Sequence, residues 1–306
     1  MSLRLTILGC HSATPRSLTY TSSQFLEMNN ECCLIDCGEG TQRQLRKYKI
    51  KFSRIKNIFI SHLHGDHFFG LIGLISTFSL LNRNSELNIF GPKGLKEIIQ
   101  LQLKLSKSWI DFPLRFHELS SKESELILET DRIKVHTIPL KHRIYTNGFL
   151  FREQTQPRKL NMAAISKYKE IDICDYQNLK NGKDYKLENG TVIPNKELTS
   201  DPVKPLSYAY CSDTEYFEAI IPHIERVDLL YHEATFLEEH RHLAEKTKHS
   251  TAYQAAKIAK NALVKNLILG HYSSRYTSLD LFLEEAGKLF PNAQLAEAGK
   301  EISLSN

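Results

Sequence analysis

The segment "SHLHGDH", residues 61–67, places three histidines and one aspartate within six positions, directly after the strand-like apolar run "NIFI". The apolar run Phe68–Leu80, which is compatible with a helix, follows it. The chain is therefore expected to form a strand, a ligand-rich loop and a helix in this order, with the last two polar members in the first helical turn. The members of this cluster are His62, His64, Asp66 and His67.

Such a loop can hold metal ions. Neutral imidazoles and carboxylates are zinc ligands, and the loop can direct His62 and His64 to one centre and Asp66 and His67 to a second. Two adjacent centres suit two ions about 3.5–4 Å apart. A group of surface histidines without a metal is the alternative interpretation. The density of ligands in so short a segment favours the metal centre.

Three further candidate ligands follow apolar runs elsewhere in the chain. His142 follows "VHTIPLK", Asp213 follows "YAYCS" and His271 follows "LILG". Any one of them alone is more typical of an ordinary loop residue, but loops of an α/β sheet converge on a ligand beyond the strand ends. Together with the cluster they complete two coordination shells, with Asp213 placed to bridge them.

Strand-like and helix-like runs alternate over the first 140 residues and again after residue 205, which predicts an α/β layered fold. With 306 residues, 41% hydrophobic and 25% charged, the chain is expected to be a soluble globular protein with a sizeable core. One large domain, residues 1–306, accounts for this length, although two are possible. Pro92 follows a strand ending at Phe90 and is expected in a first helical turn.

Residues 152–205 interrupt the alternation. They hold ten Lys/Arg, eight Asp/Glu and two Asn-Gly turns, with only short apolar runs. This composition predicts an inserted flexible arm, and a small lid or surface loop is the alternative.

Net charge and targeting signals place few limits on function. The net charge of +5 is modest, but Arg43–Arg54 carries six basic residues and no acidic one. This segment is either a solvated helix end or a set of phosphate contacts. The N-terminus lacks a long apolar stretch, no run reaches the roughly 20 residues that cross a bilayer, and six cysteines form no CxxC pair. A cytoplasmic protein without a membrane partner is expected.

The motifs, in their order along the chain, resemble the ribonuclease Z family of the metallo-β-lactamase superfamily. The resemblance rests on "LGCHSATP", "LIDCGEGTQRQL", "ISHLHGDHFFGL", "GPKGL", "PLKH", "YCSDT", "HEAT", "KHST" and "GHYSSRY". It implies a four-layer αββα fold with residues 152–205 as an exosite arm for transfer RNA. It also implies a homodimer in which the arm of one subunit presents precursor transfer RNA to the other.

The resemblance assigns the metal ligands and the reaction. It implies that His62, His64 and His142 hold one zinc ion, that Asp66, His67 and His271 hold the other, and that Asp213 bridges the two. A zinc-bound hydroxide would then cleave precursor transfer RNA, leaving a 3′-hydroxyl on the transfer RNA and a 5′-phosphate on the trailer. Asp66 is also a candidate general base, a role that competes with that of a pure ligand.

A His–Glu pair is implied for the leaving oxygen. By the resemblance, His249 of "KHST" donates the proton and Glu233 of "HEAT" holds its imidazole in the charged form. From the residues alone, His249 at a helix N-terminus with Ser250 as the cap is nearly as good an interpretation. His232 is a weaker partner because it lies on the opposite side of the strand.

Candidate substrate contacts lie in the arm and in "SSRY". They are Arg158, Lys159, Lys180, Lys183, Ser273 and Arg275. Plain solvation is the alternative for the arm cations. A small-molecule phosphodiesterase or other hydrolase on the same fold, and a non-catalytic RNA-binding protein, are the alternative functions.

Overall fold

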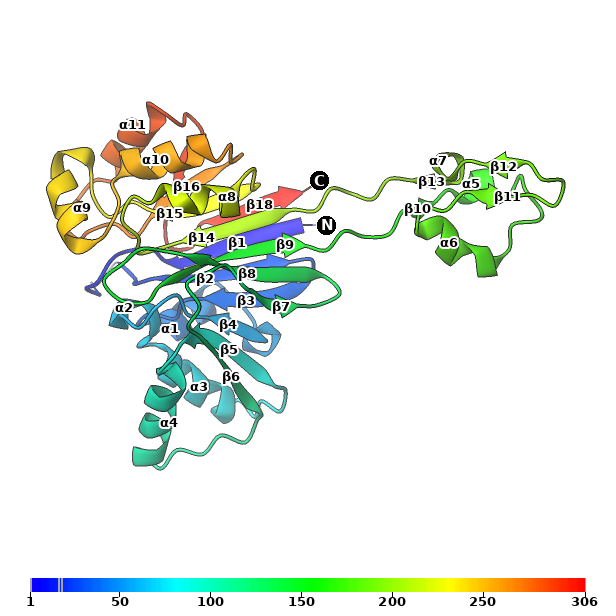
Figure 1. Cartoon of the computed structure of the whole chain (residues 1–306). Helices are drawn as coiled ribbons and strands as arrows, with labels where there is room; N and C mark the ends of the chain where they lie inside the picture. The colour runs from blue at the N-terminus through cyan, green and yellow to red at the C-terminus, as the bar shows by residue number, and fades with distance from the viewer. Residues whose placement is uncertain (1, 16, 18, 306) are drawn as a thin grey trace. The chain divides into compact units, whose positions relative to one another are not determined.

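The computed structural model describes residues 2–15, 17 and 19–305, and two seven-stranded sheets dominate it (Figure 1). The first sheet has the order β18-β1-β2-β3-β4-β5-β6. Its strands are β1 (Ser2–Gly9), β2 (Ser23–Met28), β3 (Glu31–Ile35), β4 (Asn57–Phe59), β5 (Leu87–Pro92), β6 (Leu114–Leu119) and β18 (Glu301–Ser305).

The second sheet has the order β17-β16-β15-β14-β9-β8-β7. Its strands are β7 (Leu126–Glu129), β8 (Ile133–Pro139), β9 (Asn147–Glu153), β14 (Ser207–Cys211), β15 (Leu229–Glu233), β16 (Leu267–Gly270) and β17 (Ala293–Leu295).

Strand direction brings several loops to one edge of each sheet. Strands β3, β4, β5 and β6 pair in parallel, as do β14, β15 and β16. Because β9 is antiparallel to both β8 and β14, strand β8 runs in the same direction as β14. The loops after these parallel strands therefore leave from the same edge of their sheet, which is where a ligand binds in such sheets.

The two sheets pack face to face, with helices on both outer faces (Figure 1). Side chains alternate along β4 and the residue after it. Phe59 belongs to the core between the sheets, whereas Ile58 and Ile60 belong to the core beneath the helices of the first sheet. The helices of the first half are α1 (Thr41–Lys47), α2 (Gly65–Phe68), α3 (Leu71–Leu80) and α4 (Leu95–Leu105). Those of the second half are α8 (Ile221–Ile224), α9 (Arg241–Thr247), α10 (Ala252–Asn261) and α11 (Asp280–Gly287). The expected four-layer αββα arrangement is confirmed.

Two local expectations need correction. Pro92 does not begin a helix, because β5 continues through it in pairing with β6, and α4 starts three residues later behind the left-handed Gly94. The apolar run Phe68–Leu80 is not one helix, since α2 ends at Phe68 and α3 begins at Leu71.

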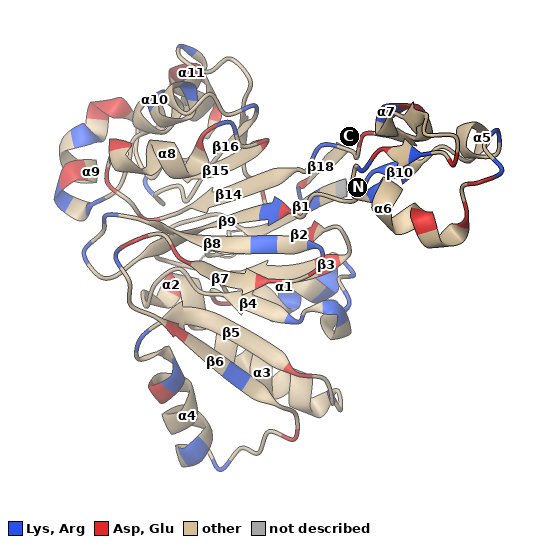
Figure 2. Ribbon diagram, turned by 45° about the vertical axis from the view of Figure 1, so that its right-hand side comes forward, with Lys and Arg blue, Asp and Glu red and all other residues tan. Residues whose placement is uncertain are grey.

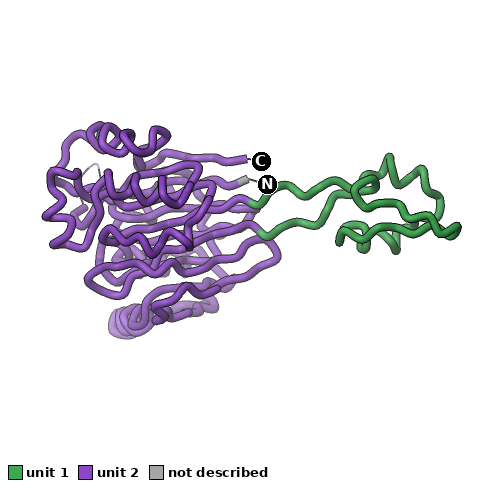
Figure 3. The backbone as a smooth tube through the Cα atoms, turned by 45° about the horizontal axis from the view of Figure 1, so that its top comes forward, with its two compact units in different colours: residues 1, 154–205, 306 green, residues 2–153, 206–305 purple. Residues whose placement is uncertain are grey.

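Residues 154–205 form a compact unit of their own (Figure 3). They contain short helices and two small two-stranded sheets. The elements are β10 (Lys159–Leu160), α5 (Met162–Ile165), α6 (Tyr176–Lys180), β11 (Tyr185–Lys186), β12 (Val192–Ile193), α7 (Asn195–Leu198) and β13 (Thr199–Ser200). A small core holds this unit together, made of Ile165, Ile171, Leu179, Ile193 and Leu198.

Within residues 2–15, 17 and 19–305, no helix is both long and apolar enough to cross a bilayer.

Replacing Phe59 tests the core between the sheets. Its ring stacks on Phe90 at 4.9 Å between centroids and meets Phe149 and Phe151 of the opposite sheet at 5.4 and 5.2 Å. Phe59→Ala is expected to lower the free energy of unfolding by about 3–5 kcal/mol in denaturant titrations, because it leaves a cavity. Leu281→Ala, at an exposed site on α11, is the control and should change it by less than about 0.5 kcal/mol. Equal effects of the two changes would contradict this account of the core.

Candidate metal centre

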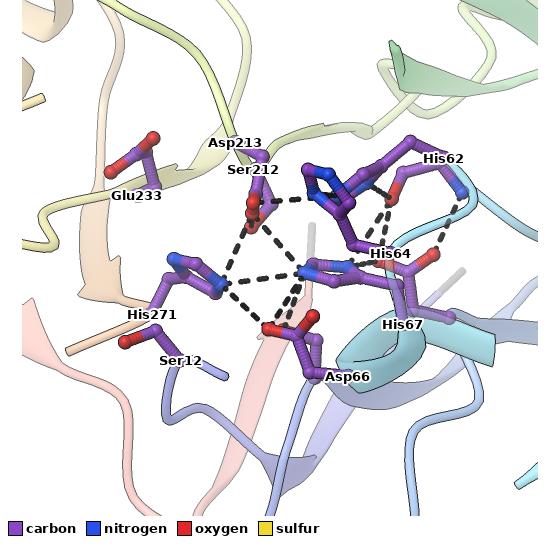
Figure 4. A network of polar contacts seen from close by, with 12 residues as sticks. Ser12, His62, His64, Asp66, His67, Ser212, Asp213, Glu233 and His271 are labelled. Carbon is purple, nitrogen blue, oxygen red and sulfur yellow. Dashed lines mark hydrogen bonds and ion pairs between the residues drawn. The ribbon is translucent and has the colours of Figure 1, made fainter. Parts of the chain in front are cut away.

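The seven predicted ligands all follow the carboxyl ends of strands. The loop after β4 supplies the four of the "HLHGDH" segment, and α2 begins within that segment, so Asp66 and His67 lie in its first turn as predicted. His142, Asp213 and His271 follow β8, β14 and β16. Figure 4 shows side chains from these loops pointing toward one another.

The first group of ligand atoms comes from three histidines. His62 Nε2 lies 3.0 Å from His64 Nδ1, and His142 Nε2 lies 3.3 Å from the same atom. Asp213 Oδ2 completes the group, 3.4 Å from His62 Nε2. All four side chains offer a ligand atom within 4.8 Å of one another.

The second group lies beside the first. His67 Nε2 is 3.3 Å from His271 Nε2, and Asp66 Oδ2 is 3.5 Å from each of these atoms. The backbone N–H of Ala13 donates a hydrogen bond to the same Asp66 oxygen at 2.8 Å, which fixes its position. The N-terminal loop thus supports a candidate ligand that is 53 residues away in the chain.

Asp213 connects the two groups. Its Oδ2 faces the first group, while Oδ1 lies 3.2 Å from His67 Nε2 and 3.1 Å from His271 Nε2. Asp213 and His271 both have left-handed backbone conformations, with φ of 59° and 61°. Such strained backbone is concentrated at functional sites, and here it turns both side chains toward the centre.

The outer nitrogens of the rings determine which atoms face the centre. His67 Nδ1 contacts Asp36 Oδ2 at 2.7 Å, His142 Nδ1 contacts the Lys248 carbonyl at 2.8 Å, and His271 Nδ1 contacts Thr235 Oγ1 at 2.9 Å. When these nitrogens carry the ring proton, each Nε2 lone pair is directed inward. Converging lone pairs repel one another unless a cation lies between them, so the donor set fits metal ions.

Asp36 was not singled out by the sequence. Its carboxylate is fully buried and also accepts hydrogen bonds from the Ser61 backbone N–H and hydroxyl, and from the Tyr210 hydroxyl. It occurs in the "LIDCGEG" motif directly after β3, and its position at a strand end was the available signal.

The protonation tendencies agree with a cation site. Burial lowers the pKa of His64 and His142 to about 4, so both are neutral as metal ligands must be. Burial alone would also lower the pKa of His67, but the carboxylates of Asp213, Asp66 and Asp36 raise it well above its usual value. These carboxylates therefore favour positive charge at the second group.

Glu233 and His249 form the predicted pair. Glu233 Oε1 lies 2.8 Å from His249 Nδ1, and burial of His249 is outweighed by the Glu233 charge, which raises the pKa of His249 to about 9. Thr235 was not recognised in the sequence: its hydroxyl donates to Glu233 Oε2 at 2.6 Å and contacts His271 Nδ1. The pair and the second ligand group are thus connected through one hydroxyl.

The structure supports neither Ser250 as a helix cap next to His249 nor His232 as the partner of His249. Ser250 is not the helix cap, because Thr251 caps α10 in a capping box with Gln254, while Ser250 donates to the Thr214 carbonyl. The ring of His232 contacts the Glu233 carbonyl at 2.7 Å. Glu233, and not His232, is the partner that His249 contacts.

A cavity of about 510 Å³ opens onto the ligands. Asp66, Asp213, His249 and His271 line it, and so does the predicted contact Ser273. Arg275 is exposed and lies outside the residues that line it.

The arm cations lie within the 154–205 unit. Arg158, Lys159 and Lys180 line a cavity of about 560 Å³ there, whereas Lys183 is exposed outside it. Arg158 is already engaged by Asp201 and by Thr199 Oγ1.

The basic segment Arg43–Arg54 is formed by α1 and the turn after it (Figure 2). Arg54 pairs with Glu27, and Arg46 lies over the Phe52 ring at 5.1 Å. Phosphate contacts by this segment and by the arm cations stay predictions.

The arrangement of the sheets and helices identifies the class of protein to which the chain belongs. The chain has the metallo-β-lactamase fold, as in the metallo-β-lactamase fold protein YhfI from Bacillus subtilis, with a TM-score of 0.69, 18% identity and coverage of 99% of this chain and 100% of that one. Human tRNase Z, short form, has a TM-score of 0.71 and 28% identity, with 98% of both chains covered.

Sequence comparison narrows the class to a family. A ribonuclease Z from Bacteroides thetaiotaomicron is 45% identical over 302 residues, which cover 99% of this chain and 95% of that protein. The chain belongs to the ribonuclease Z family of endoribonucleases. Residues 3–157 also match the family model described as Anti-Pycsar protein Apyc1, so this half of the chain belongs to that sequence family too.

Replacing Thr235 tests the support of the second group. Thr235→Val removes the hydroxyl that joins His271 to Glu233. Metal affinity, measured by chelator competition, is expected to fall about 10–100-fold, because a misoriented imidazole binds metal weakly. Thr235→Ser keeps the hydroxyl and should bind as the wild type does. Tight binding by the valine variant would show that the hydroxyl does not support the site.

Proposed function

We propose that this endoribonuclease removes 3′ trailers from precursor transfer RNA, leaving a 3′-hydroxyl on the transfer RNA and a 5′-phosphate on the trailer. One observation carries the proposal: two groups of candidate ligands, joined by Asp213, adjoin a cavity in a chain that is 45% identical over nearly its full length to a ribonuclease Z. We place the reaction in the cytoplasm, which the six cysteines support, because all are free.

Two zinc ions are the cofactors we propose. One would be held by His62, His64 and His142, the other by Asp66, His67 and His271, with Asp213 shared. Bound zinc would supply a hydroxide nucleophile at neutral pH and would neutralise charge on the phosphate. The imidazole and carboxylate donors favour zinc.

The chain's own groups handle the protons. Asp66 Oδ2 is held toward the second group by the Ala13 N–H, so the Asp66 carboxylate is placed to accept a proton from the attacking water. His249 lines the same cavity, and Glu233 keeps its imidazole protonated at neutral pH. The imidazole is therefore suited to donate a proton to the leaving 3′-oxygen.

The direct test is to incubate the zinc-loaded protein with a precursor transfer RNA that carries a 3′ trailer and to map the cut. A single cut at the trailer junction with the stated ends is expected. Lost cleavage with unaltered RNA binding in Asp66→Ala would support the enzyme. Absence of measurable cleavage by the wild type with zinc present would instead support a non-catalytic RNA-binding protein.

The proton-donor role of His249 predicts a dependence on the leaving group. His249→Ala should slow cleavage of precursor transfer RNA by about 10²–10⁴-fold. It should affect bis(p-nitrophenyl) phosphate far less, because p-nitrophenolate leaves without a proton. Glu233→Gln should show the same pattern more weakly. Equal losses on both substrates would indicate that His249 acts in another way.

The arm is proposed as the transfer RNA exosite. Its cavity lined by Arg158, Lys159 and Lys180 suits contact with phosphates. Deleting residues 155–200 should abolish precursor cleavage and spare hydrolysis of bis(p-nitrophenyl) phosphate. Equal survival of both activities would contradict the exosite and would favour a small-molecule phosphodiesterase or other hydrolase.

The protein is proposed to act as a homodimer. Several large apolar side chains near the ends of α3 and α4 are exposed. The Ser79 hydroxyl of α3 donates a hydrogen bond to the Trp109 carbonyl, so the end of α3 lies next to the segment that follows α4. The exposed side chains are Leu80, Leu81, Leu105 and Trp109, the last with 84% of its surface exposed. An apolar patch of this kind is suited to a second copy of the chain.

Mixing two inactive variants tests whether the subunits cooperate. One variant lacks residues 155–200, and the other carries His62→Ala. After exchange of subunits, about a quarter of wild-type activity is expected, because half of the dimers are mixed and each has one intact centre served by its partner's arm. No recovery, despite mixed dimers in light scattering and mass spectrometry, would contradict cooperation between subunits.

A further inference from the structure

Two adjacent phenylalanines follow the last ligand of the "HLHGDH" segment and lie in different surroundings. Phe68 is 5% exposed and packs in the core beneath the helices. Phe69 is 58% exposed and lines the cavity that contains Asp66, Asp213 and His249. The rings of the two phenylalanines meet edge to face, with centroids 5.0 Å apart. The chain thus anchors one ring and leaves the next uncovered beside the metal ligands.

The position of the Phe69 ring is defined by its neighbours. It lies over Gly65, where an added Cβ would be 2.2 Å from Phe69 Cε2. The next residue, Gly70, packs closely against the chain, since an added Cβ there would be 2.1 Å from the Gly38 carbonyl oxygen, and its N–H donates to the Cys37 carbonyl at 2.9 Å. The backbone N–H of Phe69 also donates to the Gly65 carbonyl at 2.9 Å. Absence of a side chain at Gly65 therefore makes room for the ring.

An exposed ring at this place suits an aromatic ligand. Burial of a phenyl ring lowers the free energy, and the exposed Phe69 ring does not gain this. Its apolar face is therefore available to a ligand that enters the cavity. Proteins bind unpaired bases of single-stranded RNA by stacking them on aromatic side chains.

We propose that Phe69 is a stacking platform for a nucleobase of the RNA substrate next to the scissile phosphate. This inference rests on the proposed function, since it requires RNA in the cavity. The ring touches the substrate but takes no part in bond breaking, so it contributes to binding and positioning of the cleaved strand. The stacking face is indifferent to base identity, which suits trailers of differing sequence.

Substitution of Phe69 by alanine removes the platform. In Phe69→Ala, kcat/KM for precursor transfer RNA should fall about tenfold, mainly through KM, as is typical for loss of one base–aromatic stack. Phe69→Trp should restore the rate, while Phe69→Leu, apolar but not aromatic, should not. Metal content and oligomeric state should stay unchanged. Leu281→Ala, also a loss of an exposed apolar side chain, is the matched control and should behave as the wild type.

A double-mutant cycle tests direct contact. Precursors with a single abasic nucleotide are prepared for each position flanking the cleavage site. At the stacked position, the wild type should lose about as much as Phe69→Ala loses on intact RNA, and the combination should show no further loss. Additive losses at every flanking position, or an unchanged rate for Phe69→Ala, would overturn the proposal. Failure of the wild type to cleave intact precursor would instead contradict the proposed function.

Discussion

A hydrogen bond between the sheets, from the Tyr210 hydroxyl to Asp36 Oδ2 at 2.6 Å, is the interaction on which the site depends. Tyr210 belongs to β14 of the second sheet, and Asp36 directly follows β3 of the first. The same Asp36 oxygen lies 2.7 Å from His67 Nδ1. Because the candidate ligands come from both sheets, this buried carboxylate couples the packing of the sheets to the position of His67, one of the candidate ligands. The hydrogen bonds that the Asp36 carboxylate accepts offset the free-energy cost of burying its charge.

A second buried carboxylate has a similar role on the other side of the centre. Glu233 accepts hydrogen bonds from the backbone N–H groups of Thr214 and Ser250, which fix the loops after β14 and before α10. Its Oε2 accepts a hydrogen bond from the Thr235 hydroxyl, which also contacts His271 Nδ1. Its Oε1 contacts His249 Nδ1. The proposed proton donor and the second group of candidate ligands therefore share one support.

Local sequence patterns predicted much of this architecture, and their failures have local reasons. The "HLHGDH" segment follows a strand and enters a helix as expected, since apolar β-rich and helix-compatible runs flank it. Pro92 lies in a strand and not at a helix start, because a proline can occupy either position and its pairing with Leu119 is a tertiary contact. Ser250 and Thr251 both suit a cap, and the geometry relative to Gln254 selected Thr251.

Side-chain chemistry and short-range periodicity were enough to predict the types of the candidate ligands, their placement after strands and the alternation of strands and helices. The groups that support these side chains could not be predicted in this way. The Ala13 N–H and the Lys248 carbonyl contact Asp66 and His142 from distant parts of the chain. Every residue has a backbone donor or acceptor, so no residue type marks those that are used. Their roles arise from the distances between loops that folding brings together.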